Sequence, residues 1–514
     1  MSADLILENA DIVTCNPLQP KAEALAIKGG YILRVGTQTQ ISALSTAGTR
    51  IINCQGATLV PGFNDAHYHY FATLRRQLSL DLSPATVRSI QDIQSAIRDK
   101  IPHLKPGSWI TGTGYNEFYL TDKRHPNCRD LDAAAPENPV IIIHRSLHAC
   151  VLNSTALRLV GISSESEEPP GGLIDRFLDS GEPNGLLFEM LDWVQTRIHS
   201  PLSSNEFLAG VEEVNRRNLE MGITSFTDAT VTNDRKQYHS FYELVGSGKI
   251  KSRVNLMLGF EHMAEAIEIH KEIKQGTRLI KTGCLKIVIS NATGRMRPQQ
   301  TELNRMVLEA NQHGFQVAVH AVEKEAVEAT ATALEYARRN LRGIELRNRL
   351  EHCSECPQEL AVRLSKLRAV VVTQPSFLYY QGERYLSEID VQTQAYLYPF
   401  KSLIEAGVKV AGSSDSPVVS GHPLTGIHSA VNRLAESGQA LLPSERLSPV
   451  TALEMFTVNA AFASFEETVK GTLFDGQLAD MVLLSDNPLS CHPEKIKEIK
   501  VLKTLIGGKI LWEQ

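Results

Sequence analysis

Two histidines, His67 and His69, stand at the end of the apolar run Thr58-Leu-Val-Pro-Gly-Phe-Asn-Asp-Ala-His-Tyr-His. Side chains two residues apart on a β-strand point to the same face, and two imidazoles on one inward face can hold a single divalent cation. The pair is also compatible with two ordinary histidines. The metal interpretation gains support because Pro61-Gly62 and Asp65-Ala66 place the pair at the end of a strand.

Four further residues of metal-ligand type lie in or at the end of apolar runs far downstream: Lys286, His320, His352 and Asp415. Parallel strands of a barrel end at one mouth, so residues at successive strand ends meet there although they are distant in sequence. The ordered set therefore predicts a metal site at the mouth of a barrel.

Lys286 stands in Cys284-Leu-Lys-Ile-Val-Ile, with apolar neighbours on both sides. Burial makes an amine costly to charge, so its pKa should fall and the amine should become nucleophilic. A neutral amine can take up carbon dioxide and form a carbamate, whose two oxygens could bridge two metals. The alternative from the residues themselves is a lysine paired with a buried acid or standing at the sheet edge.

The other downstream residues each have a simpler interpretation as well. His320 closes Val317-Ala-Val-His, His352 closes Arg349-Leu-Glu-His, and each could be a hydrogen-bonded core histidine. Cys353 and Cys356 raise a structural-zinc alternative, but the sequence offers no second Cys/His pair at a suitable spacing. Asp415 could cap a helix instead of holding a metal and moving a proton.

His148 follows the strand-like run Val140-Ile-Ile-Ile-His and could polarise a substrate carbonyl. A loop histidine that hydrogen-bonds a backbone carbonyl is the alternative. The chain has no Gly-x-Ser-x-Gly nucleophile motif and no phosphate-binding Gly-Lys-Ser/Thr loop.

The composition is that of an ordinary soluble globular protein. The chain has 514 residues, 42% hydrophobic and 21% charged, with a net charge of −6. That balance and the lack of a basic run argue against nucleic acid. No apolar stretch approaches the roughly 18 residues that cross a bilayer, and the N-terminus lacks the pattern of a signal peptide. Eight scattered cysteines suit a reduced, cytoplasmic protein.

The middle of the chain alternates helix and strand patterns. Leu303, Met306, Val307 and Ala310 lie on one helical face, and the strand 315–320 follows at once. This rhythm predicts an α/β fold with a (β/α)8 TIM barrel. Nine candidate strands begin near 57, 139, 223, 254, 284, 315, 347, 369 and 408, one too many for eight. We therefore expect an inserted lid or subdomain at about 80–200.

Both ends of the chain have β-hairpin patterns, around Gly29-Gly30 and Gly507-Gly508. We expect residues 1–60 and 468–514 to form one small composite β-sandwich, and residues 61–467 to form the barrel domain with its insertion. Two unrelated hairpins are the alternative.

Several motifs together resemble the amidohydrolase superfamily, and within it the YtcJ-like group (amidohydrolase family 3), which includes N-substituted formamide deformylase. They are Pro61-Gly-Phe-Asn-Asp-Ala-His-Tyr-His, His148-Ala-Cys-Val-Leu-Asn-Ser, Val319-His-Ala-Val, Leu350-Glu-His-Cys, Gly412-Ser-Ser-Asp-Ser-Pro-Val and Asp475-Gly-Gln-Leu-Ala-Asp. The resemblance spans nearly the whole chain. One departure is Leu147, where the family commonly has a glycine before the substrate histidine.

The resemblance implies the following roles. The family's metal positions match His67, His69, His320, His352 and Asp415, and its carboxylated lysine matches Lys286. The substrate-facing histidine matches His148. The implied enzyme is a metal-dependent hydrolase of a C–N bond in an amide or formamide, in which Asp415 moves the proton. The implied cofactor is one or two divalent ions, Zn²⁺ first, although these ligands also suit Fe, Mn or Ni.

Three alternatives stay open at this point. The first is a deaminase of the same superfamily, for which Glu323, three residues past His320, is a poor match as proton donor. The second is an ester or lactone hydrolase. The third is a metal-free scaffold, which should have lost its ligands. A homo-oligomer is expected on general grounds.

Overall fold

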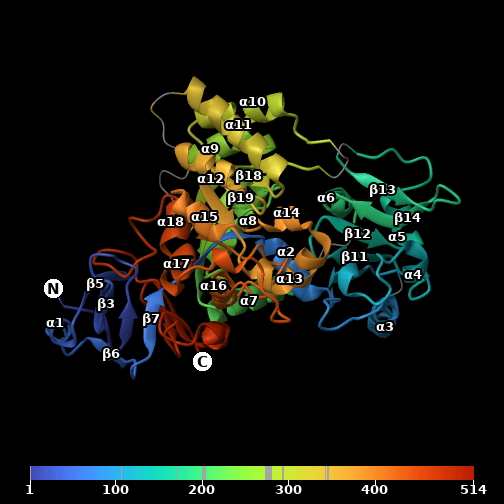
Figure 1. Ribbon diagram of the computed structural model, residues 1–514. Coiled ribbons are helices and arrows are strands. Elements are labelled where there is room, and N and C mark those ends of the chain that lie inside the picture. Colours follow the sequence, from blue (N-terminus) through green and yellow to red (C-terminus); the bar gives the residue numbers. More distant parts are fainter. Residues whose placement is uncertain are drawn as a thin grey trace. The chain divides into compact units, whose positions relative to one another are not determined.

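The computed structural model describes residues 2–105, 107–169, 171–198, 204–272, 280–291, 295–341, 343 and 346–514 (Figure 1). The chain divides into two compact units. The first contains residues 1–69, 215–289 and 299–514, and the second contains residues 70–214 and 290–298. Each unit is described by itself below.

The first unit contains the barrel. Within the described residues, one eight-stranded sheet runs in chain order, and each neighbouring pair is parallel. Its strands are β8 (Phe63–Tyr68), β15 (Ile223–Asp228), β16 (Arg253–Gly259), β17 (Ile280–Val288), β18 (Val317–Ala321), β19 (Arg349–His352), β20 (Val370–Thr373) and β21 (Lys409–Gly412). The predicted TIM barrel is confirmed.

Helices alternate with these strands, as the periodicity predicts (Figure 1). They are α7 (Ser204–Glu220), α8 (Arg235–Gly246), α9 (Met263–Glu272), α10 (Gln300–Gln312), α11 (Lys324–Asn340), α12 (Gln358–Lys366), α13 (Ser376–Glu388), α14 (Val391–Gln394), α15 (Phe400–Glu405), α16 (Pro423–Asn432), α17 (Pro449–Met455) and α18 (Val458–Ala463). In α10 the apolar face found in the sequence is buried. In the part of the chain that the structure describes, no helix combines the length and the apolar character needed to cross a bilayer.

The ninth candidate strand, near residue 139, lies in the second unit. It is β11, part of a sheet with the order β13-β14-β12-β11-β10-β9 among the described residues. The bounds are β9 (Leu80–Asp81), β10 (Ile110–Tyr115), β11 (Val140–His144), β12 (Ala149–Leu152), β13 (Leu173–Arg176) and β14 (Pro183–Phe188), with α2 (Tyr70–Leu78), α3 (Ile90–Lys100), α4 (Cys128–Asp132), α5 (Ser154–Val160) and α6 (Leu191–Gln195). The insertion thus forms its own sheet; its role as a lid stays a prediction.

Two further sheets in the first unit come from the ends of the chain. One has the order β5-β4-β1-β6, and the other has the order β24-β23-β22-β7-β2-β3. Their bounds are β1 (Leu5–Glu8), β2 (Asp11–Val13), β3 (Lys21–Ala22), β4 (Ala24–Lys28), β5 (Tyr31–Gly36), β6 (Arg50–Asn53), β7 (Thr58–Pro61), β22 (Met481–Leu484), β23 (Val501–Ile506) and β24 (Lys509–Glu513), and the short helix α1 (Gln38–Ser42) follows β5.

The second of these sheets joins both ends of the chain, because β7 pairs with β22 antiparallel. In Figure 1 this appears as the blue strand β7 beside red C-terminal chain. The two sheets share one apolar core, which includes Leu7 and Leu25 from the first and Leu59, Met481 and Leu505 from the second. This agrees with the expected sandwich, whereas domain limits at residues 60 and 468 stay a prediction.

The chain passes from sandwich to barrel at Gly62. A Cβ atom there would lie 2.2 Å from Oγ1 of Thr224, so a glycine is required between β7 and β8. A second link is the buried pair of Arg253, at the start of β16, and Asp480, at the end of the motif 475–480. Arg253 donates to both carboxylate oxygens of Asp480, at 2.6 and 2.9 Å. That part of the family motif is therefore structural.

Candidate metal centre

His67, His69 and Asp415 come together where the first and last barrel strands end. The backbone amide of Asp415 donates to the carbonyl oxygen of His67 at 2.9 Å, and the amide of His69 donates to that of Ser416 at 2.9 Å. These bonds bring the segment after β21 against the end of β8. Oδ1 of Asp415 lies 3.0 Å from Nε2 of His69 and 3.5 Å from Nε2 of His67.

A ligand atom of each of these three residues lies within 4.8 Å of the other two. No other group of three or more His, Cys, Asp or Glu residues could hold a metal ion in this way within the described parts of the chain. Asp415 and His67 are buried, and 19% of the His69 side chain is exposed. Of the three side chains, that of His69 is the most exposed.

The remaining histidines continue the cluster. The ring of His352 lies 5.0 Å from that of His67, and the ring of His320 lies 4.4 Å from that of His352, measured between centroids. All four imidazoles therefore follow one another, from His69 through His67 and His352 to His320. The carboxyl ends of β8, β18 and β19 position them, as expected for a barrel mouth.

Lys286 lies in β17, next to β18, and is 3% exposed. Burial lowers the pKa of its amine, and the opposing influence of Glu351 and Asp415 does not restore it. The positive charge of Lys286 also helps to lower the pKa of His67 and of His352. The lysine thus belongs to the same electrostatic cluster as the histidines.

Three of the histidines have their Nδ1 atom occupied by a neighbour. Nδ1 of His67 lies 2.5 Å from Oε2 of Glu351, that of His69 lies 3.0 Å from Oγ1 of Thr230, and that of His352 lies 2.8 Å from Oε1 of Gln374. Partners on Nδ1 fix the orientation of metal-binding imidazoles and leave Nε2 as the ligand atom.

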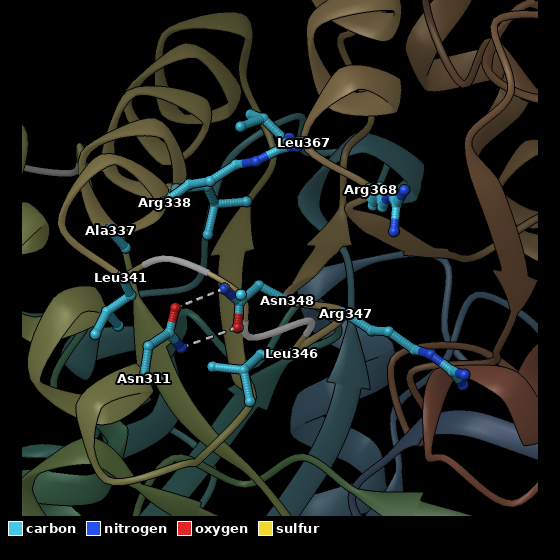
Figure 2. Close-up of a pocket in the computed structure, with 11 residues that line it drawn as sticks. Asn311, Ala337, Arg338, Leu341, Leu346, Arg347, Asn348, Leu367 and Arg368 are labelled. Carbon is cyan, nitrogen blue, oxygen red and sulfur yellow. Dashed lines mark hydrogen bonds between the residues drawn. The ribbon is translucent and has the colours of Figure 1, made fainter.

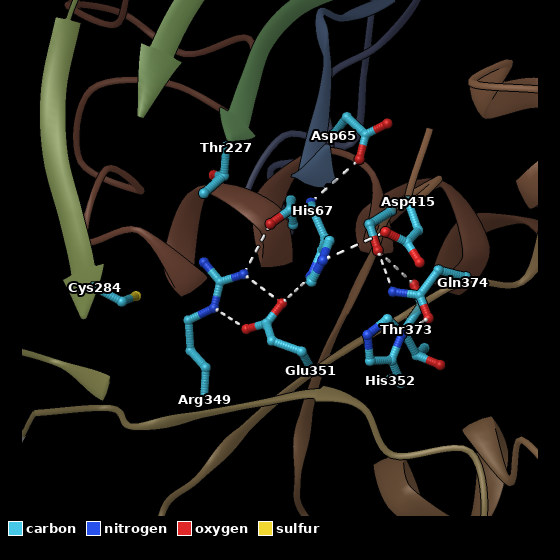
Figure 3. A network of polar contacts seen from close by, with 12 residues as sticks. Asp65, His67, Thr227, Cys284, Arg349, Glu351, His352, Thr373, Gln374 and Asp415 are labelled. Atoms are coloured by element: carbon cyan, nitrogen blue, oxygen red, sulfur yellow. Dashed lines mark hydrogen bonds and ion pairs between the residues drawn. The ribbon is translucent and has the colours of Figure 1, made fainter. Parts of the chain in front are cut away.

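The tautomers of two of these rings follow from the chemistry of their partners. The carboxylate of Glu351 can only accept, so His67 donates from Nδ1. Gln374 donates through Nε2 to Oγ of Ser413 at 2.9 Å, so its Oε1 accepts from His352. Figure 3 shows His67 beside Glu351 and His352 beside Gln374. Nε2 of both rings then carries a lone pair, as a metal ligand requires.

The pKa values favour the same state at neutral pH. Burial lowers the pKa of His67 well below its usual value and lowers that of His352, so both rings are neutral. For Asp415, burial would raise the pKa, but the pKa lies well below its usual range, and the hydrogen bond with His69 is the largest cause that lowers it. Neutral His67 and His352 rings beside the Asp415 carboxylate are ligands of the kind that a divalent cation binds.

Backbone strain is concentrated in this region. His352, Cys353 and Asp415 have positive φ angles of 72°, 50° and 56°. Non-glycine residues held in such conformations cost about 1–3 kcal/mol each and often mark functional sites. Asp65 supports the last segment, since it accepts from the amide of Ser414 at 3.0 Å and the amide of His67 at 3.2 Å.

His148 lies in the second unit, in the turn between β11 and β12. Its Nδ1 lies 2.9 Å from Oε1 of Glu189, and 48% of its side chain is exposed. Leu147 before it has a φ of 67°, a conformation that glycine adopts without cost. The substrate-facing role of His148 stays a prediction.

Cys353 and Cys356 are both buried, and a hydrogen bond between their side chains raises the pKa of Cys353. Among the described residues they join no third ligand residue.

A pocket of about 450 Å³ opens at the opposite ends of the strands (Figure 2). Asn348 precedes β19 and exchanges hydrogen bonds of 2.8 and 3.1 Å with Asn311. Arg347 pairs with Glu467 at 2.8 Å. Barrel enzymes react at the carboxyl ends of their strands, so this pocket is not the candidate active site.

Four residues that support the site were not predicted from the sequence: Asp65, Thr230, Glu351 and Gln374. For Glu351 a signal existed, because Arg349 and Glu351 are two charges inside a short strand that ends in a ligand. Thr230 and Gln374 stand in stretches without a distinguishing pattern, and only the fold brings them to the imidazoles.

Comparisons with known proteins agree with the expected family. The model of the amidohydrolase family matches residues 50–512. The N-substituted formamide deformylase of Arthrobacter pascens is 27% identical, with 99% of this chain and 98% of that protein covered. Protein LONG AFTER FAR-RED 3 of Arabidopsis thaliana is 28% identical, with 99% and 92% covered.

A solved structure has the same fold. The crystal structure of an uncharacterized metal-dependent hydrolase from Pyrococcus horikoshii superposes with a TM-score of 0.74, at 22% identity. The match covers 95% of this chain and 99% of that chain.

Proposed function

Because the chain belongs to the amidohydrolase family and is a hydrolase of that superfamily, we propose that it hydrolyses a C–N bond of a small amide or N-substituted formamide. The proposed cofactor is a divalent cation, Zn²⁺ first, held by His67, His69, His320, His352 and Asp415. The observation that carries the proposal is the approach of His67, His69 and Asp415 to within 4.8 Å of one another.

The donor set fits such an ion. Nδ1 of His67, His69 and His352 is occupied by Glu351, Thr230 and Gln374, so that Nε2 is the remaining donor. When bound, the cation supplies Lewis acidity and lowers the pKa of a water toward about 7.

Asp415 performs the proton transfers. Its low pKa keeps it ionised at neutral pH, so it can accept a proton from the attacking water. It then gives this proton to the nitrogen of the leaving amine, whose departure requires protonation. Hydrogen-bond donors aimed at the developing oxyanion lower the barrier, and His148, oriented by Glu189, is our candidate for that donor.

Lys286 is proposed to act as a carbamate. Its buried amine has a lowered pKa, so that a larger fraction is neutral and can add carbon dioxide. The carbamate would supply two oxygen ligands from β17, where Lys286 pairs with Ala318 of the neighbouring strand β18, two residues before His320.

The first experiment is elemental analysis after expression with added metal. We expect about one or more equivalents per chain, and less than about half an equivalent would favour a metal-free scaffold. The His67→Ala/His69→Ala variant should lose the metal. As a matched control, His239→Ala/His262→Ala removes one histidine of α8 and one that directly precedes α9, and this variant should retain the metal. Full metal content in the first variant would contradict the ligand assignment.

The second experiment identifies the reaction. The metal-loaded protein is tested with a panel of N-formyl and N-acyl amines, esters, lactones and amino-substituted heterocycles. Release of amine together with formate or carboxylate supports the proposal. Turnover confined to esters and lactones, or release of ammonia from the heterocycles, would assign one of the alternative activities instead.

A further inference from the structure

The strand β19 places two opposite charges in the interior of the barrel. Arg349 and Glu351 are both fully buried, with 0% exposure. Arg349 donates from Nε to Oε1 of Glu351 at 2.8 Å and from Nη2 to Oε2 at 3.0 Å. Nη2 also donates to the carbonyl oxygen of Ala66 at 2.8 Å. The guanidinium therefore holds both the carboxylate and the strand that carries His67.

The same carboxylate contacts a candidate ligand. Oε2 of Glu351 lies 2.5 Å from Nδ1 of His67, whose side chain is 1% exposed. Figure 3 shows the resulting line of contacts from Arg349 through Glu351 to His67 and on to Asp415. The other two partners of imidazole Nδ1 atoms, Thr230 and Gln374, are uncharged. His67 is thus singled out among the three rings.

A gain in folding stability does not explain the buried ion pair of Arg349 and Glu351. Removal of two charges from water is costly, and replacement of a buried ion pair by apolar residues is often neutral or stabilising. Apolar side chains would fill the inside of a barrel equally well. The pair is therefore better explained by what it does to His67 than by what it adds to folding.

We propose that Glu351 is a positioning residue that, held by Arg349, fixes the ring of His67 with Nε2 toward the metal position and makes His67 the dominant anchor of the ion. This inference rests on the proposed function, because it requires that the protein binds a metal. Partners of this kind commonly change metal affinity by about 10- to 100-fold when they are mutated.

The test is Glu351→Gln, which keeps the shape of the side chain and removes its charge. The amide can accept from Nδ1 of His67, but it can also turn and donate, which would move the ring proton to Nε2. We expect Zn²⁺ affinity, measured by competition with a chromophoric chelator, to fall by about 10- to 100-fold. The absorption spectrum of the Co²⁺-substituted protein should also change, because the ligand geometry differs.

The matched control is Asp480→Asn. It disrupts the other buried ion pair described above, Arg253–Asp480, which lies between barrel and sandwich. Both variants should lower the melting temperature of the metal-free protein. Only Glu351→Gln should weaken Zn²⁺ binding and shift the Co²⁺ spectrum.

The outcomes separate the two proposals. Wild-type Zn²⁺ affinity and an unchanged Co²⁺ spectrum in Glu351→Gln would overturn the positioning role while the proposed function stands. A wild-type protein that binds no metal would overturn the proposed function itself. If Glu351→Gln does not fold, Arg349→Lys decides, because lysine keeps the charge but cannot hold the carboxylate with two bonds; unchanged Zn²⁺ affinity there overturns the role as well.

Discussion

The backbone amide of Asp415 donates to the carbonyl oxygen of His67 at 2.9 Å, although the two residues lie at opposite ends of the barrel sheet. The bond joins the first strand to the segment after the last. The same contact brings the Asp415 carboxylate to 3.5 Å from Nε2 of His67. Closure of the barrel and assembly of the candidate metal centre are therefore one structural event.

Asp415→Asn tests the proton transfer without disturbing that bond. The residue has a φ of 56°, and asparagine tolerates this conformation nearly as well as aspartate. We expect an intact fold and a loss of kcat/KM of about 10²–10⁴-fold, the usual contribution of a general acid–base group. Rates on the best substrate of the panel and a circular dichroism melt measure the two effects. Activity near the wild-type level would remove Asp415 from the mechanism.

The barrel could be predicted from the sequence because its helices and strands have strong local patterns of apolar residues. The apolar face of α10 and the strand that ends in His320 are examples, and both were predicted from residue spacing. The excess ninth strand could not be assigned in the same way. An apolar run such as Val140-Ile-Ile-Ile is equally suited to a barrel strand and to the sheet of the second unit.

The candidate ligands were predictable because each stands at a strand end, whereas their partners were not. Glu351 reaches His67 only because β19 and β8 lie in one barrel. Gln374 follows β20 and is recognised as a partner of His352 only through a contact 22 residues apart in sequence. Side-chain contacts between strands depend on register and rotamer, which local patterns do not encode.

Lys286→Ala tests the carbamate. The variant should lose most activity, and short carboxylates such as formate or acetate should restore part of it, because they can supply the missing oxygens. The measurement is activity against carboxylate concentration, with Lys281→Ala as control. Lys281 lies in the same strand and donates to the carbonyl oxygen of Ser464. Added carboxylate should therefore not change the activity of the Lys281→Ala variant. An absence of recovery in Lys286→Ala, with unchanged metal content, would argue against the carbamate.

His148→Gln tests the substrate-facing role. Because His148 lies outside the cluster of the first unit, the variant should retain its metal. If His148 stabilises the oxyanion, kcat should fall by about 10²–10³-fold. Glu189→Gln should have a smaller effect in the same direction, since it removes only the negative charge of the residue that contacts Nδ1 of His148. Equal kcat values for the wild type and both variants would show that His148 does not take part.

The helix α16 should make the protein sensitive to acid. Burial lowers the pKa of His422, just before the helix, and of His428, within it, to about 4. Asn432 donates to Nδ1 of His428 at 3.1 Å, which fits a neutral ring. In the unfolded chain both histidines titrate near 6.5.

Between pH 4 and 6.5 the unfolded state therefore binds more protons than the folded state, so the free energy of unfolding falls as the pH falls through this window. Thermal melts with a chelator, at a series of pH values from 4 to 7, measure the effect for the wild type and for His422→Gln/His428→Gln. The variant should lose less stability on acidification, because two of the groups that favour the unfolded state in acid are gone. His67 and His352 keep part of the dependence, since burial lowers their pKa too. Parallel curves for the two proteins would mean that the histidines of α16 do not contribute.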